Sequence, residues 1–438
     1  MVDAKELWKR WQALLNRYTW VFTRPGWVRF VEWVTGMVLC WEEHTITQLL
    51  TAMELAERWR VLEHFAEYGA FDRLSVERAT IRLIEERQPA RFAGYHPAAL
   101  DDTKEHRSSA SVWGTCTFHE PAGRSPNRAS TVRAHNWVVL GDLLPGQPWT
   151  YLPHTARLYF RQSQLPAGEE FCKKTSWAVE MLRQVDAESA VPILGVFDGA
   201  YATRTVIRPC LNPPAGRRRI DVVTRLREDA QLHAGKVANQ RGRPRVWGQR
   251  LPAPKNHEQW EAPWQKSSAY IYGRERSIRY RQLECYWTVT GPKELVHVFV
   301  FEVEGYDEPW YIVTTALSLS AEQVVEVFAA RYRQEDGFRD HKQRLGMEEC
   351  RAWTKEPILR TFTVQIVAQT LLRLLALDLD AAHGARSWWS APEWNRSKSH
   401  PSVLDVRRLL WRYREEFSGF LSELEESGKV PAPAARAG

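Results

Sequence analysis

The sequence predicts an α/β protein, with a mixed sheet flanked by helices, a helical N-terminal part and a β-rich insertion. Three observations lead to this prediction. Apolar residues recur at helical spacing up to about residue 90, and strand patterns then alternate with amphipathic helical segments. A length of 438 residues, 44% of them hydrophobic and 12% aromatic, suffices for two or three domains with a sizeable core. The expected parts are residues 1–90, 91–212, 213–311, 312–378 and 379–438.

Residues 1–90 are predicted to be helical. Apolar residues from Trp27 to Met37 fall at helical spacing, directly after a Pro-Gly pair. The next segment, residues 44–71, is expected to form several short helices with Thr45 as an N-cap. Such a module is either a helix-turn-helix that reads DNA or a small bundle that only packs.

Strands are predicted from about residue 91, separated by Gly- and Pro-rich turns. A short apolar run, HPAALDD, ends in Asp101 and Asp102. An amphipathic helix at residues 173–187 then leads into VPILGVF, a buried-type strand that is followed directly by Asp198. An acid in that place is unusual unless it caps a helix or takes part in catalysis. Carboxylates at strand ends are where mixed sheets carry their functional sites.

Residues 213–311 are irregular and very basic, and their later part alternates like paired β-strands. Arg241, Arg243 and Arg245 belong to the sequence RGRPR, which resembles an AT-hook core whose arginines enter the minor groove. Phosphate binding by an extended basic loop is the simpler alternative. The tryptophans of this part either stack on an unpaired base or pack in the core.

The segment from Phe328 to Leu345 places charged residues where a helix should have its core face. On one helix drawn through it, Arg331, Glu335 and Lys342 share a stripe with apolar residues. Burying such charges costs several kcal/mol each unless a partner or ligand compensates them. The stripe is therefore either a functional site or a solvated face with ion pairs. A long, largely buried helix is predicted to follow it and to cover the sheet.

Charge and cysteine content narrow the class of protein. A formal net charge of +7 and a pI near 9.1 indicate a polyanionic partner. The six cysteines form no CxxC pair, so neither disulfides nor a structural zinc are indicated and a reduced, cytoplasmic setting is expected. The N-terminus has no signal-peptide apolar region, and no apolar run is expected to reach the length of a membrane span. The absence of a GxxxxGK[ST] loop indicates a reaction without ATP.

Three motifs resemble those of one known family. From Phe328 to Lys342 the order is aromatic, two residues, arginine, three residues, glutamate, six residues, lysine. This order resembles the signature helix of insertion-sequence four-type DDE transposases, in which the first position is tyrosine. LDDT at residues 100–103 and GVFDGAYA at residues 195–202 are similar to two other blocks of that family, in the same order. The resemblance covers roughly residues 20–375 and implies an RNase H-like catalytic domain.

The resemblance also implies which residues are catalytic. Asp101, Asp198 and Glu335 match the three carboxylates that hold metal in the family. Related sequences read Asp-x-Thr in the first block, which favours Asp101 together with Thr103. Asp102 is the alternative first carboxylate, because neighbours on a strand point to opposite faces and only one of them can face the metal.

Cofactor and substrate follow from the same resemblance. Two Mg²⁺ ions, which Mn²⁺ can replace, are implied, because hard divalent ions prefer carboxylate oxygens. Double-stranded DNA is the implied partner, as element ends and as target, bound by a homodimer in the bacterial cytoplasm near the nucleoid. The function that the resemblance implies is metal-dependent DNA strand cleavage and strand transfer, which move an insertion sequence by cut-and-paste. The alternatives are a domesticated or inactive relative that only binds DNA, and a nuclease of the same fold without strand transfer.

The expected DNA contacts lie in two places. Arg331 and Lys342 are expected to hold phosphates beside the scissile bond, and Arg241, Arg243 and Arg245 are expected to bind DNA from the insertion. Phe328 occupies the DNA-contacting tyrosine position of the family, but it lacks the hydroxyl that contacts a phosphate.

Overall fold

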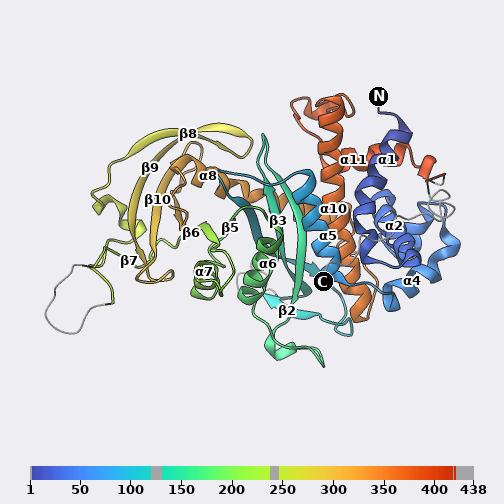
Figure 1. Cartoon of the computed structure of the whole chain (residues 1–438), viewed down its shortest axis with the longest axis horizontal. Helices are drawn as coiled ribbons and strands as arrows, with labels where there is room; N and C mark the ends of the chain where they lie inside the picture. The colour runs from blue at the N-terminus through green and yellow to red at the C-terminus, as the bar shows by residue number, and fades with distance from the viewer. Residues whose placement is uncertain (1, 120–130, 237–245, 418, 421–438) are drawn as a thin grey trace.

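The computed structural model describes residues 2–119, 131–236, 246–417 and 419–420 (Figure 1). Within these ranges the α-helices are α1 (Ala4–Leu15), α2 (Arg24–Leu39), α3 (Ile46–Thr51), α4 (Trp59–Tyr68), α5 (Arg73–Arg87), α6 (Lys174–Glu188), α7 (Arg204–Leu211), α8 (Ala321–Ala330), α9 (Tyr332–Arg344), α10 (Lys355–His383) and α11 (Val403–Arg412). The strands are β1 (His96–His106), β2 (Cys116–His119), β3 (Thr131–Leu144), β4 (Thr150–Tyr159), β5 (Ile193–Phe197), β6 (Asp221–Arg225), β7 (Leu232–His233), β8 (Gln265–Ile271), β9 (Arg274–Trp287), β10 (Leu295–Val303) and β11 (Trp310–Thr314).

All of these strands belong to one mixed sheet. Its order is β2-β3-β1-β5-β6-β11-β10-β9-β7, with β4 paired to β3 and β8 paired to β9. β1 is antiparallel to β3 but parallel to β5, and β5 is parallel to β6. The carboxyl ends of β1, β5 and β6 therefore lie at the same edge of the sheet. The predicted α/β class is confirmed, and the strands of the insertion extend the sheet (Figure 1).

Helices cover both faces of this sheet. Side chains of α6 and α7 pack with the central strands in one core, which includes Leu100 and Phe197. Side chains of α8 pack on the opposite face, in a core that includes Ala99 and Val196. Successive residues of a strand point to opposite faces, and Ala99 and Leu100 accordingly lie in different cores.

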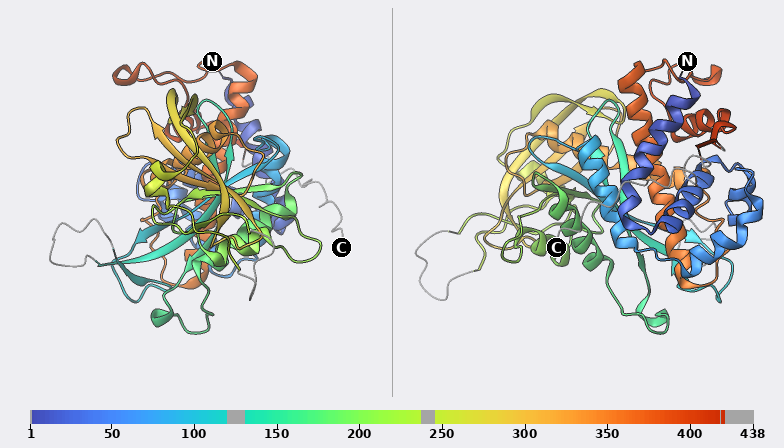
Figure 2. Two further views of the ribbon diagram at one scale, coloured as in Figure 1. Left: turned by 90° about the vertical axis from the view of Figure 1, so that its left-hand side faces the viewer. Right: turned by 45° about the vertical axis from the view of Figure 1, so that its right-hand side comes forward.

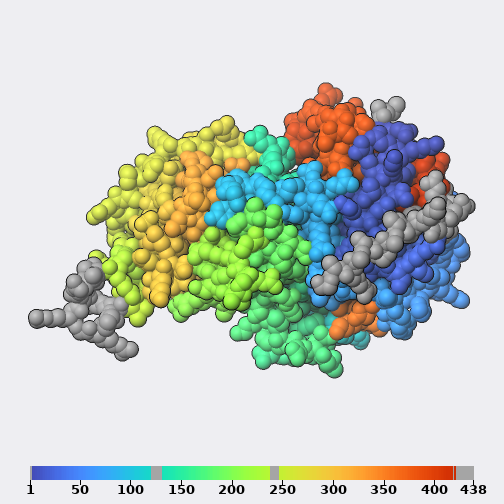
Figure 3. Space-filling model, viewed as in Figure 1, coloured from blue at the N-terminus to red at the C-terminus, as the bar shows by residue number. Residues whose placement is uncertain are grey.

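The N-terminal helices share one core with the end of the chain. Buried side chains of α1, α2, α4 and α5 pack with those of α10 and α11 around Trp11 and Trp33. Figure 2 shows α10, in orange, running among the blue N-terminal helices. Thr45 N-caps α3, as predicted, because its hydroxyl accepts a hydrogen bond from the Gln48 backbone N–H at 3.4 Å. In the space-filling view the strand insertion, the central part and the helical part form one continuous elongated body (Figure 3).

One helix departs from the expectation that no apolar run reaches the length of a membrane span. In the described part of the chain, α10 alone is long and apolar enough to cross a membrane by length and composition. However, 83% of its apolar window is buried inside the protein. It packs between β4 and the N-terminal helices. Such burial is typical of a core helix, and α10 has the covering role that the sequence predicts.

Two expected boundaries differ from the structure. The insertion was expected to begin at residue 213. However, β6 (Asp221–Arg225) lies after this point and pairs with β5, so it belongs to the central sheet. The boundary expected at residue 378 lies inside α10, which continues to His383. In both cases the secondary structure continues through a polar or charged stretch, as a paired strand in β6 and as a helix in α10.

The segment from Phe328 to Leu345 is two helices and not one. α8 ends at Ala330 and α9 begins at Tyr332, with Arg331 between them. The prediction that the segment from Phe328 to Leu345 forms one helix with a single continuous stripe is therefore wrong. Phe328 packs against the core under α8, whereas Leu345 lies in the core of the N-terminal helices.

Candidate active site

The two neighbouring acids of β1 face different helices. The Asp101 carboxylate accepts a hydrogen bond from Arg331, with Nη1 and Oδ2 3.1 Å apart. The Asp102 carboxylate contacts Lys174 of α6, with Nζ and Oδ2 2.7 Å apart, and accepts a hydrogen bond from the Tyr201 hydroxyl at 3.1 Å. The alternation along β1 thus directs Asp101 toward the third carboxylate motif and Asp102 away from it.

Asp198 lies beside Asp101 because β1 and β5 are parallel. Leu100 and Phe197 are paired in the register of these strands, so the acid that follows each of them emerges at the same edge. Burial of the Asp101 carboxylate, and then the negative charge of Asp198, raise the pKa of Asp101 to about 7. The nearby Arg331 guanidinium opposes this shift. Two carboxylates with too little compensating charge favour the binding of a cation.

Hydrogen bonds orient Asp198 within its loop. Its Oδ1 accepts a hydrogen bond from the Ala200 backbone N–H at 2.9 Å. Its backbone carbonyl accepts a hydrogen bond from the hydroxyl of Thr224, a fully buried residue of β6, at 2.9 Å. The second acid is therefore fixed by a neighbouring parallel strand and by its own turn.

Glu335, in α9, lies near the guanidinium nitrogen of Arg331 that does not bond to Asp101. The second guanidinium nitrogen, Nη2, lies 3.6 Å from Glu335 Oε1. Arg331 is mostly buried, with 17% of its side chain exposed, whereas the Glu335 side chain is 48% exposed. Arg331 thus bridges the first and third predicted carboxylates. Within the described ranges, no three His, Cys, Asp or Glu side chains lie close enough together to hold a metal ion.

Two residues that sequence reasoning missed hold α9 on the sheet. The fully buried Gln334 side chain donates from Nε2 to the Val139 carbonyl at 3.0 Å and contacts the Tyr151 hydroxyl at 3.1 Å. A Cβ on Gly337 would lie 2.8 Å from the Tyr151 ring, so only glycine allows this close approach. A glycine inside a charged helix was the available signal, because such a residue usually has a packing reason.

The other predicted DNA contacts lie away from the carboxylates or outside the described residues. Lys342 Nζ is 3.7 Å from Glu348 Oε1, near the end of β1. The Phe328 ring packs against Trp310, with centroids 6.2 Å apart. Arg241, Arg243 and Arg245 lie outside the described residues.

Tryptophans of the insertion are mainly packing residues in the described part. Trp260 and Trp287 are buried in the core shared with α6 and α7. Trp264 contacts the guanidinium groups of Arg279 and Arg281, which are 4.7 and 4.8 Å from its ring centroid. These contacts favour the packing interpretation over base stacking for these three residues.

Comparison with known families gives the class of protein. Residues 23–284, more than half of the chain, match the family model of the DDE superfamily endonucleases. The chain therefore belongs to this family, and its mixed α/β sheet with N-terminal helices is consistent with the RNase H-like fold of DDE enzymes. The matched range includes Asp101 and Asp198 and ends before Glu335. A search of curated proteins gives no match.

Proposed function

We propose that this member of the DDE superfamily endonucleases is a transposase, which cuts DNA at the ends of an insertion sequence and joins those ends to a new site. Family membership supports a nuclease or transposase that acts on DNA. The observation that carries the finer proposal is the placement of Asp101 and Asp198 side by side at one edge of the sheet. Asp101 contacts Arg331, which directly precedes the helix with Glu335 in its first turn. Arg331 directly precedes α9, and Glu335 and Lys342 lie within α9, so the arginine, the glutamate and the lysine of the transposase-like motif come from one short segment.

The residues of the site fit divalent cations by their chemistry. All three predicted ligands are carboxylates, which suit Mg²⁺ and Mn²⁺, and the pKa of Asp101 is raised by burial and by the charge of Asp198. Asp101 and Asp198 would hold the ion, and Glu335 would complete the set once Arg331 releases it. When bound, such ions activate water and neutralise charge on the leaving oxygen.

The chain's own residues would position the DNA. The planar guanidinium of Arg331 now spans two carboxylates, and the same fork fits two oxygens of a phosphate. We infer that Arg331 exchanges its carboxylate partners for the phosphate beside the scissile bond. The reaction needs no ATP, because one phosphodiester bond is exchanged for another when a freed 3′-OH attacks the target.

Arg331→Ala is expected to lower the single-turnover cleavage rate by about a hundredfold or more, with a smaller loss of DNA affinity, since many other basic residues bind the backbone. Lys342→Ala should act in the same direction with a smaller effect, because Lys342 lies beside Glu348 and not beside the carboxylates. Arg339→Ala is the matched control on α9, since its side chain is 57% exposed and pairs only with Asp336 among the described ion pairs. Normal cleavage in both Arg331→Ala and Lys342→Ala would mean that this helix is an ordinary solvated face.

The proposed function is tested with duplexes that contain the DNA flanking the gene, incubated with protein, Mg²⁺ and a target plasmid. We expect cleavage that leaves 3′-OH ends, followed by joining of those ends to the plasmid. Cleavage without joined products would identify a nuclease of the same fold. Binding without cleavage would identify an inactive relative.

A further inference from the structure

The loop that carries Asp198 is anchored on both sides of this residue. Phe197 before it is fully buried, and Tyr201 after it is 2% exposed. The two rings pack at a tilt, with centroids 6.5 Å apart. The Asp198 side chain therefore projects from a short stretch whose two ends are fixed in the core under α6 and α7.

Tyr201 also reaches the strand that carries the first acid. Its hydroxyl donates a hydrogen bond to Oδ1 of Asp102 at 3.1 Å, while Lys174 holds Oδ2 of the same carboxylate at 2.7 Å. The backbone N–H of Asp102 in turn donates to Oδ1 of Asp101 at 2.8 Å. A continuous series of hydrogen bonds thus runs from the Asp198 loop through Asp102 to Asp101.

We propose that Tyr201 is a positioning residue for the metal site, which sets the spacing of Asp101 and Asp198 through its bond to Asp102. This inference rests on the proposed function. A hydrogen bond to a charged carboxylate is stronger than one between neutral groups, and this one is mostly shielded from water. Asp102, the acid that does not face α9, therefore serves as the fixed point to which the loop of the second ligand is attached.

The Lys174 ion pair makes Asp102 a suitable anchor. Lys174 begins α6, and its Nζ lies 5.1 Å from the centroid of the Tyr159 ring as well as contacting Asp102. The carboxylate is thereby held from a helix and from the loop after β5 at once. Groups that orient metal ligands in this way typically change metal affinity by about 10- to 100-fold when they are removed.

The test is Mn²⁺ binding to the full-length, metal-free protein without DNA, measured from the electron paramagnetic resonance signal of free Mn²⁺. Tyr201→Phe keeps the ring and removes only the hydroxyl, and we expect it to raise the Kd for Mn²⁺ by about tenfold. Tyr18→Phe is the matched control, since the Tyr18 hydroxyl is also buried and lies 2.9 Å from Thr80 Oγ1, but in the N-terminal helices. The control should lose similar stability and keep the wild-type Kd.

A double-mutant cycle with Asp102→Asn separates positioning from general destabilisation. If Tyr201 acts through Asp102, the fold increase in Kd of the double variant should be well below the product of the fold increases of the two single variants. Independent, multiplicative effects would overturn the inference, as would a Tyr201→Phe variant with the wild-type Kd while Asp101→Asn abolishes Mn²⁺ binding. If Asp101→Asn and Asp198→Asn both bind Mn²⁺ like the wild type, the proposed function itself fails.

Discussion

Asp101→Asn should give a protein that no longer cuts DNA and yet is more stable than the wild type in metal-free buffer at pH 8. The wild-type carboxylate is largely buried beside Asp198, and these two factors raise its pKa to about 7. At pH 8 the folded protein therefore holds an unfavourable charge, which the isosteric amide removes. Cleavage is lost because an amide cannot replace a charged metal ligand.

The pH dependence of this stability difference has a defined sign. In the unfolded chain an aspartate has a pKa of about 4, below its folded pKa of about 7. The stability that protonated Asp101 contributes is therefore fully present below about pH 4 and is lost as the pH rises through about 7. Asp101→Asn has no such titration, so its free energy of unfolding should exceed that of the wild type by an amount that grows from about pH 4 to about pH 7.

Chemical denaturation of both proteins in EDTA at several pH values measures this difference, and a DNA cleavage assay with Mg²⁺ accompanies it. Asp102→Asn is the informative comparison, because Asp102 is paired with Lys174 and Tyr201 and its loss should not stabilise the protein. A stability advantage that shrinks as the pH rises, or cleavage by Asp101→Asn, would contradict the assignment.

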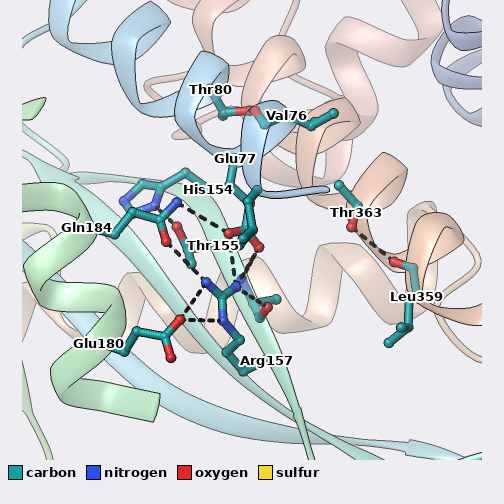
Figure 4. Close-up of polar contacts among 12 residues, drawn as sticks. Val76, Glu77, Thr80, His154, Thr155, Arg157, Glu180, Gln184, Leu359 and Thr363 are labelled. Carbon is teal, nitrogen blue, oxygen red and sulfur yellow. Dashed lines mark hydrogen bonds and ion pairs between the residues drawn. The ribbon is translucent and has the colours of Figure 1, made fainter. Parts of the chain in front are cut away.

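Arg157→Leu is expected to destabilise the fold by about 3–5 kcal/mol, because it leaves a buried glutamate without its charge partner. Arg157 of β4 and Glu77 of α5 are 8% and 4% exposed. Arg157 Nη1 lies 2.8 and 2.9 Å from the two Glu77 oxygens, and its other nitrogens contact Glu180 and Gln184 of α6 (Figure 4). This one guanidinium joins the N-terminal helices to the sheet and to the helix below it.

Two variants separate the charge effect from lost packing. Arg82→Leu removes an arginine that is 52% exposed and pairs with Glu188, so it should cost only about 0–1 kcal/mol. Glu77→Leu combined with Arg157→Leu should be more stable than Arg157→Leu alone, because no unpaired carboxylate stays buried. Urea denaturation provides the comparison. A double variant that is less stable than the single one would contradict this explanation, because both variants lack the ion pair and only the single variant keeps the buried carboxylate.

The fold class and the three motifs could be recognised from the sequence, because periodicity and motif spacing depend only on residues that are close together in the chain. The α/β class and the DDE family are confirmed. The face of each strand residue also follows from alternation, and the structure directs Asp101 toward Arg331 and Asp102 toward Tyr201. The assignment of the three carboxylates as catalytic stays a prediction.

What could not be predicted depends on contacts between distant segments. Tyr201 belongs to the motif GVFDGAYA, but its hydrogen-bond partner Asp102 is 99 residues away in sequence. Arg331 was expected to contact phosphate, and nothing in the spacing showed that it would bridge Asp101 and Glu335. The break between α8 and α9 was also hidden, because good helix-forming residues stand on both sides of it.

The most direct test of the proposed metal site is a crystal of the protein with DNA and Mn²⁺, examined by anomalous diffraction. We expect Mn²⁺ bound to the carboxylates of Asp101 and Asp198, with Arg331 moved from Asp101 to a DNA phosphate. Mn²⁺ bound to Asp102 instead, or no Mn²⁺ at Asp101 and Asp198 while Arg331 still bridges Asp101 and Glu335, would contradict the assignment.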